Sequence, residues 1–453
     1  MFSLKEIISA VDAKDVSLNT DISIKAVSID SRTINKRELF IALSGENFNG
    51  ADFINEAINK GASAVILEED IKGSFDVPIL RVISAKKALG TIARYHRSKY
   101  NIPVIGITGS NGKTQTKEML SHVLSNKFKV LNTEKNCNNK VGVSLTLLNL
   151  KDEDIAVVEV GTSLVGEIEY NASILKPTIG IITNIGPSHL EALGDLEGVL
   201  KEKIAIVESL GNDGVWIKNA DDPLLQNKTY PNIKEITYGM DSDMIEFKAV
   251  DIKETVDGLR FSVNNLDFYL PLLGKHNVYS ALSVISCASM FMDIKRIRDA
   301  MTTFTGTSMR MELLECEGFK IINDAYNSNP LSLRSAVNAL SQYKTTGRKI
   351  LISADMLELG KDSDKLHYDS GKFIADKANI DLLITHGRLS KFILEGALAS
   401  GMTRDKAQHF DNKDDIKTFL KTFLKDKDIM LVKGSRGMKM EEIINCFTTC
   451  STH

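Results

Sequence analysis

Residues 103–124, PVIGITGSNGKTQTKEMLSHVL, constrain this chain most, because they join a strand pattern, a glycine-rich turn and a helix pattern. The apolar run at 104–107 predicts a buried strand, and from Thr114 onward apolar residues recur at helical spacing. Gly109 and Gly112 allow the turn to bring its backbone N–H groups against an anion, toward which the helix points its positive end. The segment therefore predicts an α/β fold with a phosphate-binding loop.

This loop matches a short form of the nucleotide-binding pattern, G-x-x-G-K-T, because Ile107 stands where the longer form has a glycine. Lys113 adds a charge for the terminal phosphates, and Thr114 adds a hydroxyl for Mg²⁺. The alternative is a plain glycine-containing turn between a strand and a helix. We predict a nucleotide site whose phosphate-binding residues are Gly109, Ser110, Asn111, Gly112, Lys113 and Thr114.

The chain has 453 residues, a length that suggests about three domains. Three α/β patterns follow one another, and their changes place the domains at residues 1–98, 99–305 and 306–453. The middle pattern predicts a parallel sheet with crossover helices, followed by hairpins over 244–272 with turns at Asp257-Gly258 and Asn264-Asn265. Further strands are expected at 24–29, 39–43, 64–67, 79–82, 155–160, 179–185, 214–217, 320–323, 349–353, 381–385 and 428–432.

The charge balance limits the possible partners of this chain. A net charge of −3 argues against a nucleic-acid binder with a basic surface, so an anionic ligand must be held by local cations. No apolar run reaches membrane-spanning length, and the first residues lack the layout of a signal peptide. The five cysteines are scattered, which fits reduced thiols. We therefore expect a cytoplasmic protein without a membrane span or a nucleic-acid partner.

Polar residues follow several of the predicted strands, where ligands gather in parallel sheets. Glu159 ends an apolar strand and is a candidate Mg²⁺ ligand, although a solvent-facing strand end is the alternative. His189 follows a glycine-proline turn and is either structural or a metal ligand, and we expect its strand to lie beside that of Glu159. Asp324 closes a strand of the third unit, and Lys433 and Arg436 follow the last strand as a basic turn or an anion grip.

Four further segments carry weaker signals when each is taken alone. Lys203 lies on an amphipathic helix and, from its pattern alone, is one surface lysine among many. His276 and Asn277 enter a helix, where they could stack on a purine or cap the helix. The triplet Asp30-Ser31-Arg32 and the loop 44–50 fit solvated turns better than ligand sites when each is taken alone.

Taken together, these segments resemble the Mur ligases, ATP-dependent enzymes that form amide bonds in peptidoglycan precursor synthesis. The resemblance covers nearly the whole chain and includes the phosphate loop, Glu159-Val160-Gly161, residues 184–191 and Gly274-Lys275-His276-Asn277. Residues 323–330 (NDAYNSNP), 355–360 (DMLELG) and 433–441 (KGSRGMKME) look like the branch that adds D-alanyl-D-alanine to UDP-N-acetylmuramoyl-tripeptide. The resemblance implies a central ATPase domain between a UDP-binding α/β domain and a Rossmann-like C-terminal domain.

The family also implies roles for individual residues. The implied catalytic residues are Lys113, Glu159, His189, Lys203, Arg310 and Asp324, and the implied metal ligands are Thr114, Glu159, His189 and a carbamylated Lys203. The resemblance adds Asn219, Asp222, His276, Asn277, Arg310 and Asp324 to the ATP site. Substrate-binding positions would be Asp30, Ser31, Arg32, Asn136, Asn138, Asn139, Asn327, Asn329, Asp355, Lys433, Ser435 and Arg436.

The implied reaction activates the peptide carboxylate as an acyl phosphate, which the amine of D-alanyl-D-alanine then attacks. ATP and Mg²⁺ are the implied cofactors, the substrates are small molecules, and we expect a monomer. The nearest alternatives are the ligase that adds the third residue and a folylpolyglutamate synthase. A regulator that has lost catalysis would need a broken metal site, whereas Glu159, His189 and Lys203 are all present.

Overall fold

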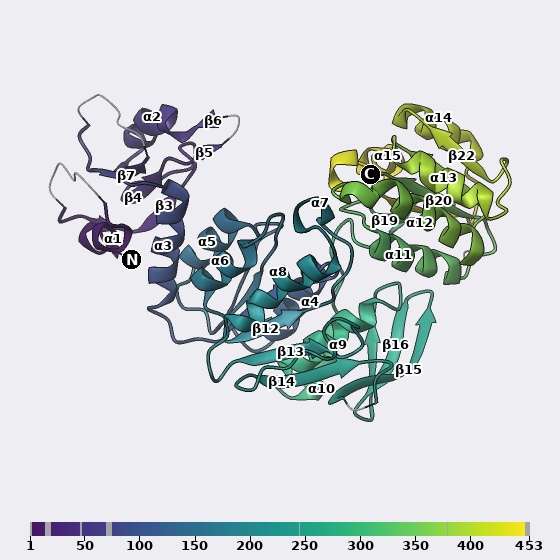
Figure 1. Cartoon of the computed structure of the whole chain (residues 1–453), viewed down its shortest axis with the longest axis horizontal. Coiled ribbons are helices and arrows are strands. Elements are labelled where there is room, and N and C mark those ends of the chain that lie inside the picture. Colours follow the sequence, from purple (N-terminus) through teal and green to yellow (C-terminus); the bar gives the residue numbers. More distant parts are fainter. Residues whose placement is uncertain are drawn as a thin grey trace.

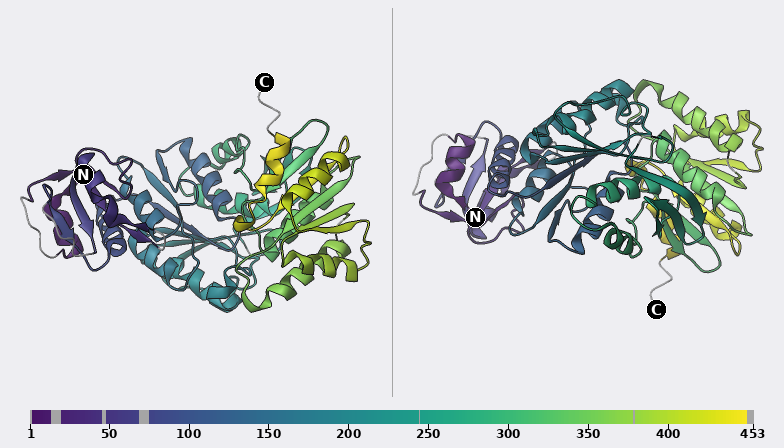
Figure 2. Two further views of the ribbon diagram at one scale, coloured as in Figure 1. Left: turned by 90° about the horizontal axis from the view of Figure 1, so that it is seen from above. Right: turned by 90° about the horizontal axis from the view of Figure 1, so that it is seen from below.

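The computed structural model describes residues 2–13, 20–45, 48–68, 75–243, 245–377 and 379–448. These residues form three α/β units that follow one another in the chain, coloured purple, blue to teal, and green to yellow in Figure 1. The central unit lies between the other two, which gives the molecule an elongated outline (Figure 2). Across the described ranges, no helix is long and apolar enough to cross a membrane.

The first unit contains a four-stranded parallel sheet in the order β3-β4-β7-β8. Its first helix begins with a capping box, in which the Ser3 hydroxyl accepts from the N–H of Glu6 and the Glu6 carboxylate accepts from the N–H of Ser3. The elements are β1 (Phe2–Ser3), α1 (Leu4–Val11), β2 (Ser23–Ile24), β3 (Ala26–Ser28), β4 (Glu38–Ile41), β5 (Ser44–Gly45), β6 (Phe48–Asn49), η1 (Gly50–Phe53), α2 (Ile54–Asn59), β7 (Ala62–Leu67), β8 (Ile79–Arg81) and α3 (Ala85–Arg97).

The central unit is built on a nine-stranded sheet in the order β10-β11-β9-β12-β13-β14-β15-β16-β17. Its strands are parallel as far as β15, and β16 and β17 are antiparallel hairpin strands. The strands are β9 (Val104–Thr108), β10 (Val130–Asn132), β11 (Ile155–Glu159), β12 (Ile179–Ile182), β13 (Val215–Asn219), β14 (Lys234–Gly239), β15 (Phe247–Thr255), β16 (Gly258–Val263) and β17 (Leu266–Leu270). The helices are α4 (Lys113–Ser125), α5 (Lys140–Leu148), α6 (Glu167–Leu175), α7 (Leu190–Leu193), α8 (Leu196–Glu208), α9 (Asn277–Ala288) and α10 (Ile294–Met301).

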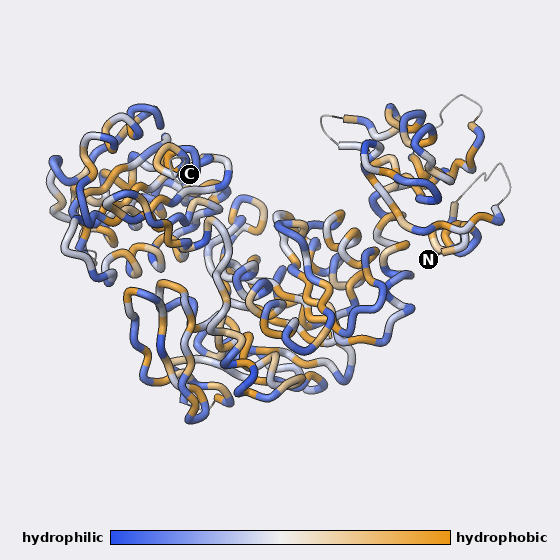
Figure 3. Tube along the Cα trace, turned by 180° about the vertical axis from the view of Figure 1, so that it is seen from behind, coloured by the Kyte–Doolittle hydropathy of each residue, from blue (hydrophilic) through white to orange (hydrophobic). Residues whose placement is uncertain are grey.

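Helices cover both faces of this sheet, because alternate side chains of each strand enter different cores. In β9, Val104 packs into the core beneath α5, α6 and α8, whereas Ile105 and Ile107 pack into the core beneath α4, α9 and α10. Burial on both faces explains why β9, β11 and β12 read as continuous apolar runs. In Figure 3, hydrophobic residues are concentrated in the interior of the units, and hydrophilic residues are more frequent at the periphery.

The third unit is a six-stranded sheet in the order β18-β19-β23-β20-β21-β22, antiparallel only at β18. Its helices lie on both faces of the sheet (Figure 2). The elements are β18 (Glu312–Glu315), β19 (Lys320–Asp324), α11 (Pro330–Gln342), β20 (Lys349–Ala354), η2 (Gly360–Asp362), α12 (Ser363–Lys377), β21 (Leu382–His386), α13 (Ser390–Ala399), β22 (Ala407–Phe410), α14 (Lys413–Phe423), β23 (Ile429–Lys433), η3 (Arg436–Met438) and α15 (Glu441–Thr448).

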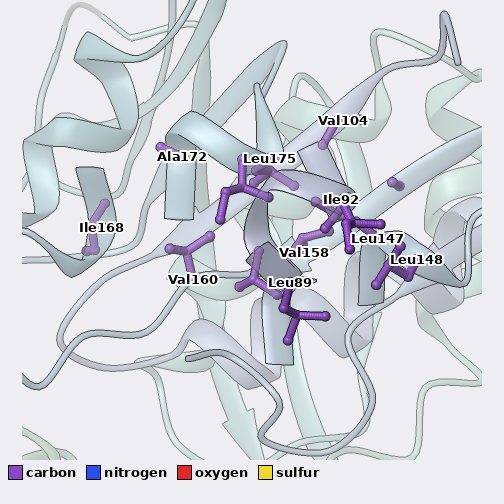
Figure 4. Close-up of a cluster of buried hydrophobic side chains, with 14 of the residues drawn as sticks. Leu89, Ile92, Val104, Leu147, Leu148, Val158, Val160, Ile168, Ala172 and Leu175 are labelled. Carbon is purple, nitrogen blue, oxygen red and sulfur yellow. The ribbon is translucent and has the colours of Figure 1, made fainter. Parts of the chain in front are cut away.

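The first two units share one hydrophobic core. Leu89 and Ile92 of α3 belong to the same buried cluster as Leu147 of α5, Val158 of β11 and Leu175 of α6 (Figure 4). The chain therefore leaves the first unit through a helix that is already packed on the second.

Most predicted elements are present, with some differences. The hairpins form. Their first turn lies at Val256-Asp257, one residue before the expected position, and the second lies at Asn264-Asn265 as expected, where both residues adopt left-handed backbone conformations. The strand expected at 24–29 is broken into β2 and β3, and β1, β5, β6, β10, β14, β18 and β22 were not anticipated. The expectation that the strands of Glu159 and His189 are neighbours is wrong, because β9 lies between β11 and β12.

Candidate nucleotide and ligase site

A cavity of about 540 Å³ lies between the central and third units. It opens at the carboxyl ends of the central strands, where parallel α/β sheets bind ligands. The cavity is lined by the phosphate loop and by residues of the third unit, and the predicted site residues among them are Ser110, Asn111, Gly112, Lys113, Thr114, Asn138, Asn139, Glu159, His189, Asn219, Asp222, His276, Asn277, Arg310, Asp324, Asn327, Asn329 and Lys433.

The phosphate loop connects the end of β9 to the start of α4. Gly109 has φ +148°, and a Cβ there would lie 1.8 Å from Oγ1 of Thr183, so only glycine fits. Nζ of Lys113 donates to the Gly109 carbonyl at 2.7 Å. Burial lowers the pKa of Lys113, the Glu159 carboxylate opposes that shift, and the Arg310 guanidinium adds to it. The loop thus concentrates a lysine and backbone N–H groups in a partly dry site.

Glu159 is a buried carboxylate at the end of β11. Its Oε1 accepts from Nδ2 of Asn138 at 2.7 Å, and its N–H donates to Oγ1 of Thr133 at 3.0 Å. Its Oε2 is buried without a hydrogen-bond partner. Because a buried ionised oxygen requires a cation or a donor, this atom fits a metal ligand.

The donor set around this carboxylate suits Mg²⁺. Among the described residues, no three His, Cys, Asp or Glu side chains gather as a metal cluster. Mg²⁺ is usually held by one or two carboxylates together with waters and substrate phosphates, so it does not need such a cluster. The Glu159 carboxylate and the Thr114 hydroxyl, both lining the cavity, therefore fit a magnesium ion shared with a bound nucleotide.

The sequence pattern indicated a surface position for Lys203, but the residue is buried. It lies on the inner face of α8 with 1% of its surface exposed, and it is not among the residues that line the cavity. Burial lowers its pKa well below the usual value, the charge of Lys113 lowers it further, and Glu202 opposes the shift. The amphipathic pattern was misleading because α8 is covered on more than one side.

Several side chains of the third unit reach the phosphate loop. Nη2 of Arg310 donates to Oγ1 of Thr114 at 2.9 Å, and the guanidinium lies 4.1 Å from the ring centre of Tyr326. Nδ2 of Asn329 donates to Oδ1 of Asn111 at 2.8 Å. These contacts bring a cation of the third unit to the place where the terminal phosphates of a nucleotide would lie.

Asp324 and Lys433 form a buried pair at the same wall of the cavity, with Nζ 2.6 Å from Oδ2. The Lys433 amine also donates to the carbonyl of Asn327 at 2.9 Å. The pair therefore holds the ends of β19 and β23 beside the segment that carries Asn327.

The residues expected around adenine all line the cavity. Burial lowers the pKa of His276 to about 4, so its imidazole is neutral near pH 7. The Asp222 carboxylate accepts from the N–H groups of Ile185, Leu224 and Leu225, which commits it to holding the loop. Tyr279 also lines the cavity, but it was not predicted because its position inside a helix carries no sequence signal.

Other predicted residues lie away from this cavity. Asp30 pairs with Arg32, which lowers the pKa of Asp30 to about 2, and the Ser31 hydroxyl donates to Glu56. Residues 46 and 47 of the loop 44–50 lie outside the described residues. The cavity lining also excludes Asn136, Asp355, Ser435 and Arg436.

Asp355, Ser435 and Arg436 all have structural partners within the third unit. The Asp355 carboxylate accepts from the N–H and hydroxyl of Ser390, and Arg436 pairs with Glu441. These side chains thus hold loops of the third unit in place.

Family models match most of the chain. Residues 23–97 match the Mur ligase family catalytic domain, residues 107–288 the Mur ligase middle domain and residues 309–436 the Mur ligase glutamate ligase domain. A UDP-N-acetylmuramoyl-tripeptide--D-alanyl-D-alanine ligase of Bacillus subtilis (strain 168) is 36% identical over 430 residues, which cover 93% of this chain and 92% of that protein.

Solved structures agree with these matches. A crystal structure of MurF from Acinetobacter baumannii has a TM-score of 0.90 and 27% identity, and the match covers 98% of each chain. MurF ligase from Thermotoga maritima in complex with ADP has a TM-score of 0.83 and 25% identity over 93% of this chain and 96% of that one. The three-unit fold, the cavity at the phosphate loop and these full-length matches establish that the chain belongs to the Mur ligase family.

Proposed function

We propose that this chain is an ATP-dependent ligase that adds D-alanyl-D-alanine to UDP-N-acetylmuramoyl-tripeptide. The products are UDP-N-acetylmuramoyl-pentapeptide, ADP and phosphate. The observation that carries the proposal is the cavity in which the phosphate loop, the unpaired oxygen of buried Glu159 and Arg310 of the third unit meet. The name of the Bacillus subtilis relative and the ADP complex of the Thermotoga maritima ligase support the substrates.

The residues of the cavity suit phosphoryl transfer to a carboxylate. The free carboxylate of the tripeptide attacks the γ-phosphorus of ATP, the bond to the β-phosphate oxygen breaks, and ADP leaves. Lys113 and Arg310 stabilise the charge that spreads over the transferring group, because both cations are aimed at the phosphate loop before the reaction begins. The amine of D-alanyl-D-alanine then attacks the acyl carbon, loses a proton, and expels phosphate.

Mg²⁺, when bound, would neutralise phosphate charge and polarise the γ-phosphoryl group. We assign its ligands to Thr114, Glu159 and His189, together with a carbamylated Lys203. The lowered pKa of Lys203 supports the modification, because a neutral amine can attack carbon dioxide and lose a proton to give an anionic carbamate. Such a carbamate would replace a buried cation with a metal-organising anion.

The remaining assignments follow the same scheme. We assign the adenine site to Asn219, Asp222, His276 and Asn277, and the uridine site to the first unit at Asp30, Ser31 and Arg32. Asn136, Asn138 and Asn139 would lie near the substrate diphosphate, and the segment from Asn327 to Asn329 with Lys433 would face the dipeptide. Asp355, Ser435 and Arg436 would act at its edge. We further propose a cytoplasmic monomer with domains at 1–98, 99–305 and 306–453.

Phosphate release tests the proposal. Purified protein with ATP, Mg²⁺ and UDP-N-acetylmuramoyl-tripeptide should release phosphate rapidly only after D-alanyl-D-alanine is added. Two pairs of substrates serve as controls for the related ligases. Glutamate with a folate tests for a folylpolyglutamate synthase, and lysine or diaminopimelate with UDP-N-acetylmuramoyl-dipeptide tests for the ligase that adds the third residue. Release that depends on one of those amines, or no release with any of them, would refute the assignment.

A further inference from the structure

The side chain of His189 meets a carboxylate of the third unit. Its Nδ1 lies 2.5 Å from Oε2 of Glu358, although the two residues are 169 positions apart in the chain. An ionised carboxylate only accepts hydrogen bonds, so Nδ1 is the donor in this contact and Nε2 takes no part in it. His189 lines the cavity and Glu358 does not. Nε2 is thus the ring nitrogen that remains available to a ligand in the cavity.

We propose that Glu358 is a positioning residue that orients His189 for metal binding. By accepting from Nδ1, Glu358 fixes the tautomer and the ring orientation in which Nε2 binds Mg²⁺, as carboxylates behind metal-binding histidines commonly do. Because Glu358 belongs to the third unit, it can act only when that unit is docked on the central unit. The inference rests on the proposed function, in which His189 is a metal ligand.

The backbone around the contact indicates that the fold holds His189 and Glu358 in place. His189 and Glu358 have φ +53° and +63°, a left-handed conformation that side chains with a Cβ rarely adopt. The carbonyl of Glu358 accepts from the N–H of Glu191 at 3.3 Å. Gly360 has φ +65°, and a Cβ there would lie 3.3 Å from Cα of Glu191, so the segments around α7 and η2 approach closely. Strained backbone on both sides is thus retained where the two side chains meet.

The loop that carries Glu358 is anchored within the third unit. The N–H of Met356 donates to Nε2 of His367 at 2.9 Å. The N–H of Leu357 donates to the hydroxyl of Ser435 at 2.8 Å. These bonds immediately precede Glu358, so its carboxylate follows the position of the third unit rather than moving independently.

The exposure of His189 and Glu358 argues against a role in which their contact only holds the central and third units together. The side chain of Glu358 is 56% exposed and that of His189 is 22% exposed. Ion pairs in contact with water contribute little to stability, because the solvent screens them and the side chains lose freedom. The contact is therefore better suited to orienting the imidazole than to holding the units together.

Titration with Mn²⁺, followed by electron paramagnetic resonance, tests the proposal on the full chain with a non-hydrolysable ATP analogue. Glu358→Ala should weaken Mn²⁺ binding by about 10- to 100-fold, the usual effect of removing a partner behind a ligand. Glu358→Gln should weaken it less, because an amide oxygen still accepts from Nδ1. Glu395→Gln is the matched control, since Glu395 is an exposed glutamate on α13 of the same unit, and it should bind as the parent does.

A double variant separates positioning from a general structural role. If Glu358 acts through His189, the His189→Ala and Glu358→Ala double variant should bind Mn²⁺ no more weakly than His189→Ala alone. Parental affinity in Glu358→Ala, or additive losses in the double variant, would overturn the inference. Turnover of the parent enzyme with the tripeptide nucleotide and dipeptide is measured in parallel. Failure of that turnover alone would refute the proposed function, whereas parental Mn²⁺ binding by Glu358→Ala in a working enzyme refutes only the role of Glu358.

Discussion

Replacing Lys203 should separate the stability of the protein from its activity. Lys203 is 1% exposed, and burial lowers the pKa of its amine, so the folded state disfavours the proton that the unfolded chain binds. Lys203→Met keeps most of the volume and removes the buried amine, so in buffer freed of carbon dioxide it should be at least as stable as the parent. Lys203→Ala leaves a cavity and should lose about 2–3 kcal/mol, within the range for large-to-small substitutions. For a unit of roughly 200 residues this is a decrease of about 4–12 °C in Tm.

The pH dependence of this effect has a definite sign. Because the pKa of Lys203 is lower in the folded state than in the unfolded chain, the unfolded chain binds more protons at neutral pH. The stability of the parent should therefore rise with pH toward the ordinary lysine pKa of about 10.5. The advantage of Lys203→Met should be largest at neutral pH and should vanish as the pH approaches that value, as measured by calorimetry.

Activity should fall in both variants, whichever way their stability changes. Both Lys203 variants should lose roughly 100-fold or more of kcat, as expected when a group that organises transition-state charge is removed. A short carboxylic acid added to Lys203→Ala should restore part of the phosphate release, because it can occupy the cavity as an anion. It should not help Lys203→Met, in which the side chain fills that space. Full activity of either variant, or equal rescue of both, would refute the carbamate and the reasoning from burial.

Three further outcomes are expected. Arg310→Lys should lower kcat by roughly 10- to 1,000-fold in steady-state assays. An ammonium lacks the planar guanidinium that reaches Thr114 and stacks on the ring of Tyr326. An unchanged kcat would contradict this. Gly109→Ala should abolish nucleotide binding in calorimetric titrations, since its Cβ would overlap the Thr183 hydroxyl, whereas Gly211→Ala, with nothing within 4 Å, should bind normally. X-ray scattering should show compaction when an ATP analogue and the tripeptide nucleotide are added, because acyl phosphates require exclusion of water; no change would count against domain closure.

The parts that could be predicted from the sequence depend on short stretches of chain. The positive φ of Gly109 is required by the turn itself, and the adjacent strand and helix patterns place this turn at the end of β9, although the contact with Thr183 could not be read from this stretch. Asn264 and Asn265 likewise adopt the left-handed conformations that a two-residue hairpin needs. In each case the physical constraint acts within a few residues, so the local sequence is sufficient to reveal it.

The order of the strands in the central sheet could not be predicted from local sequence patterns. The carboxyl ends of β11 and β12 were both expected at the site, which is correct, but β9 separates them. Which strand inserts between two others depends on how crossover helices pack on the sheet, and periodicity within one segment carries no record of that.

The sequence by itself determined the family, the phosphate loop and the alternation of strands and helices, because these depend on residue type and spacing along the chain. Only the tertiary structure decided that Lys203 is buried and that Glu358 meets His189. The physical reason is that burial and hydrogen bonding arise from elements that are distant in sequence. The same lysine or glutamate would be an ordinary solvated side chain if the units around it were packed differently.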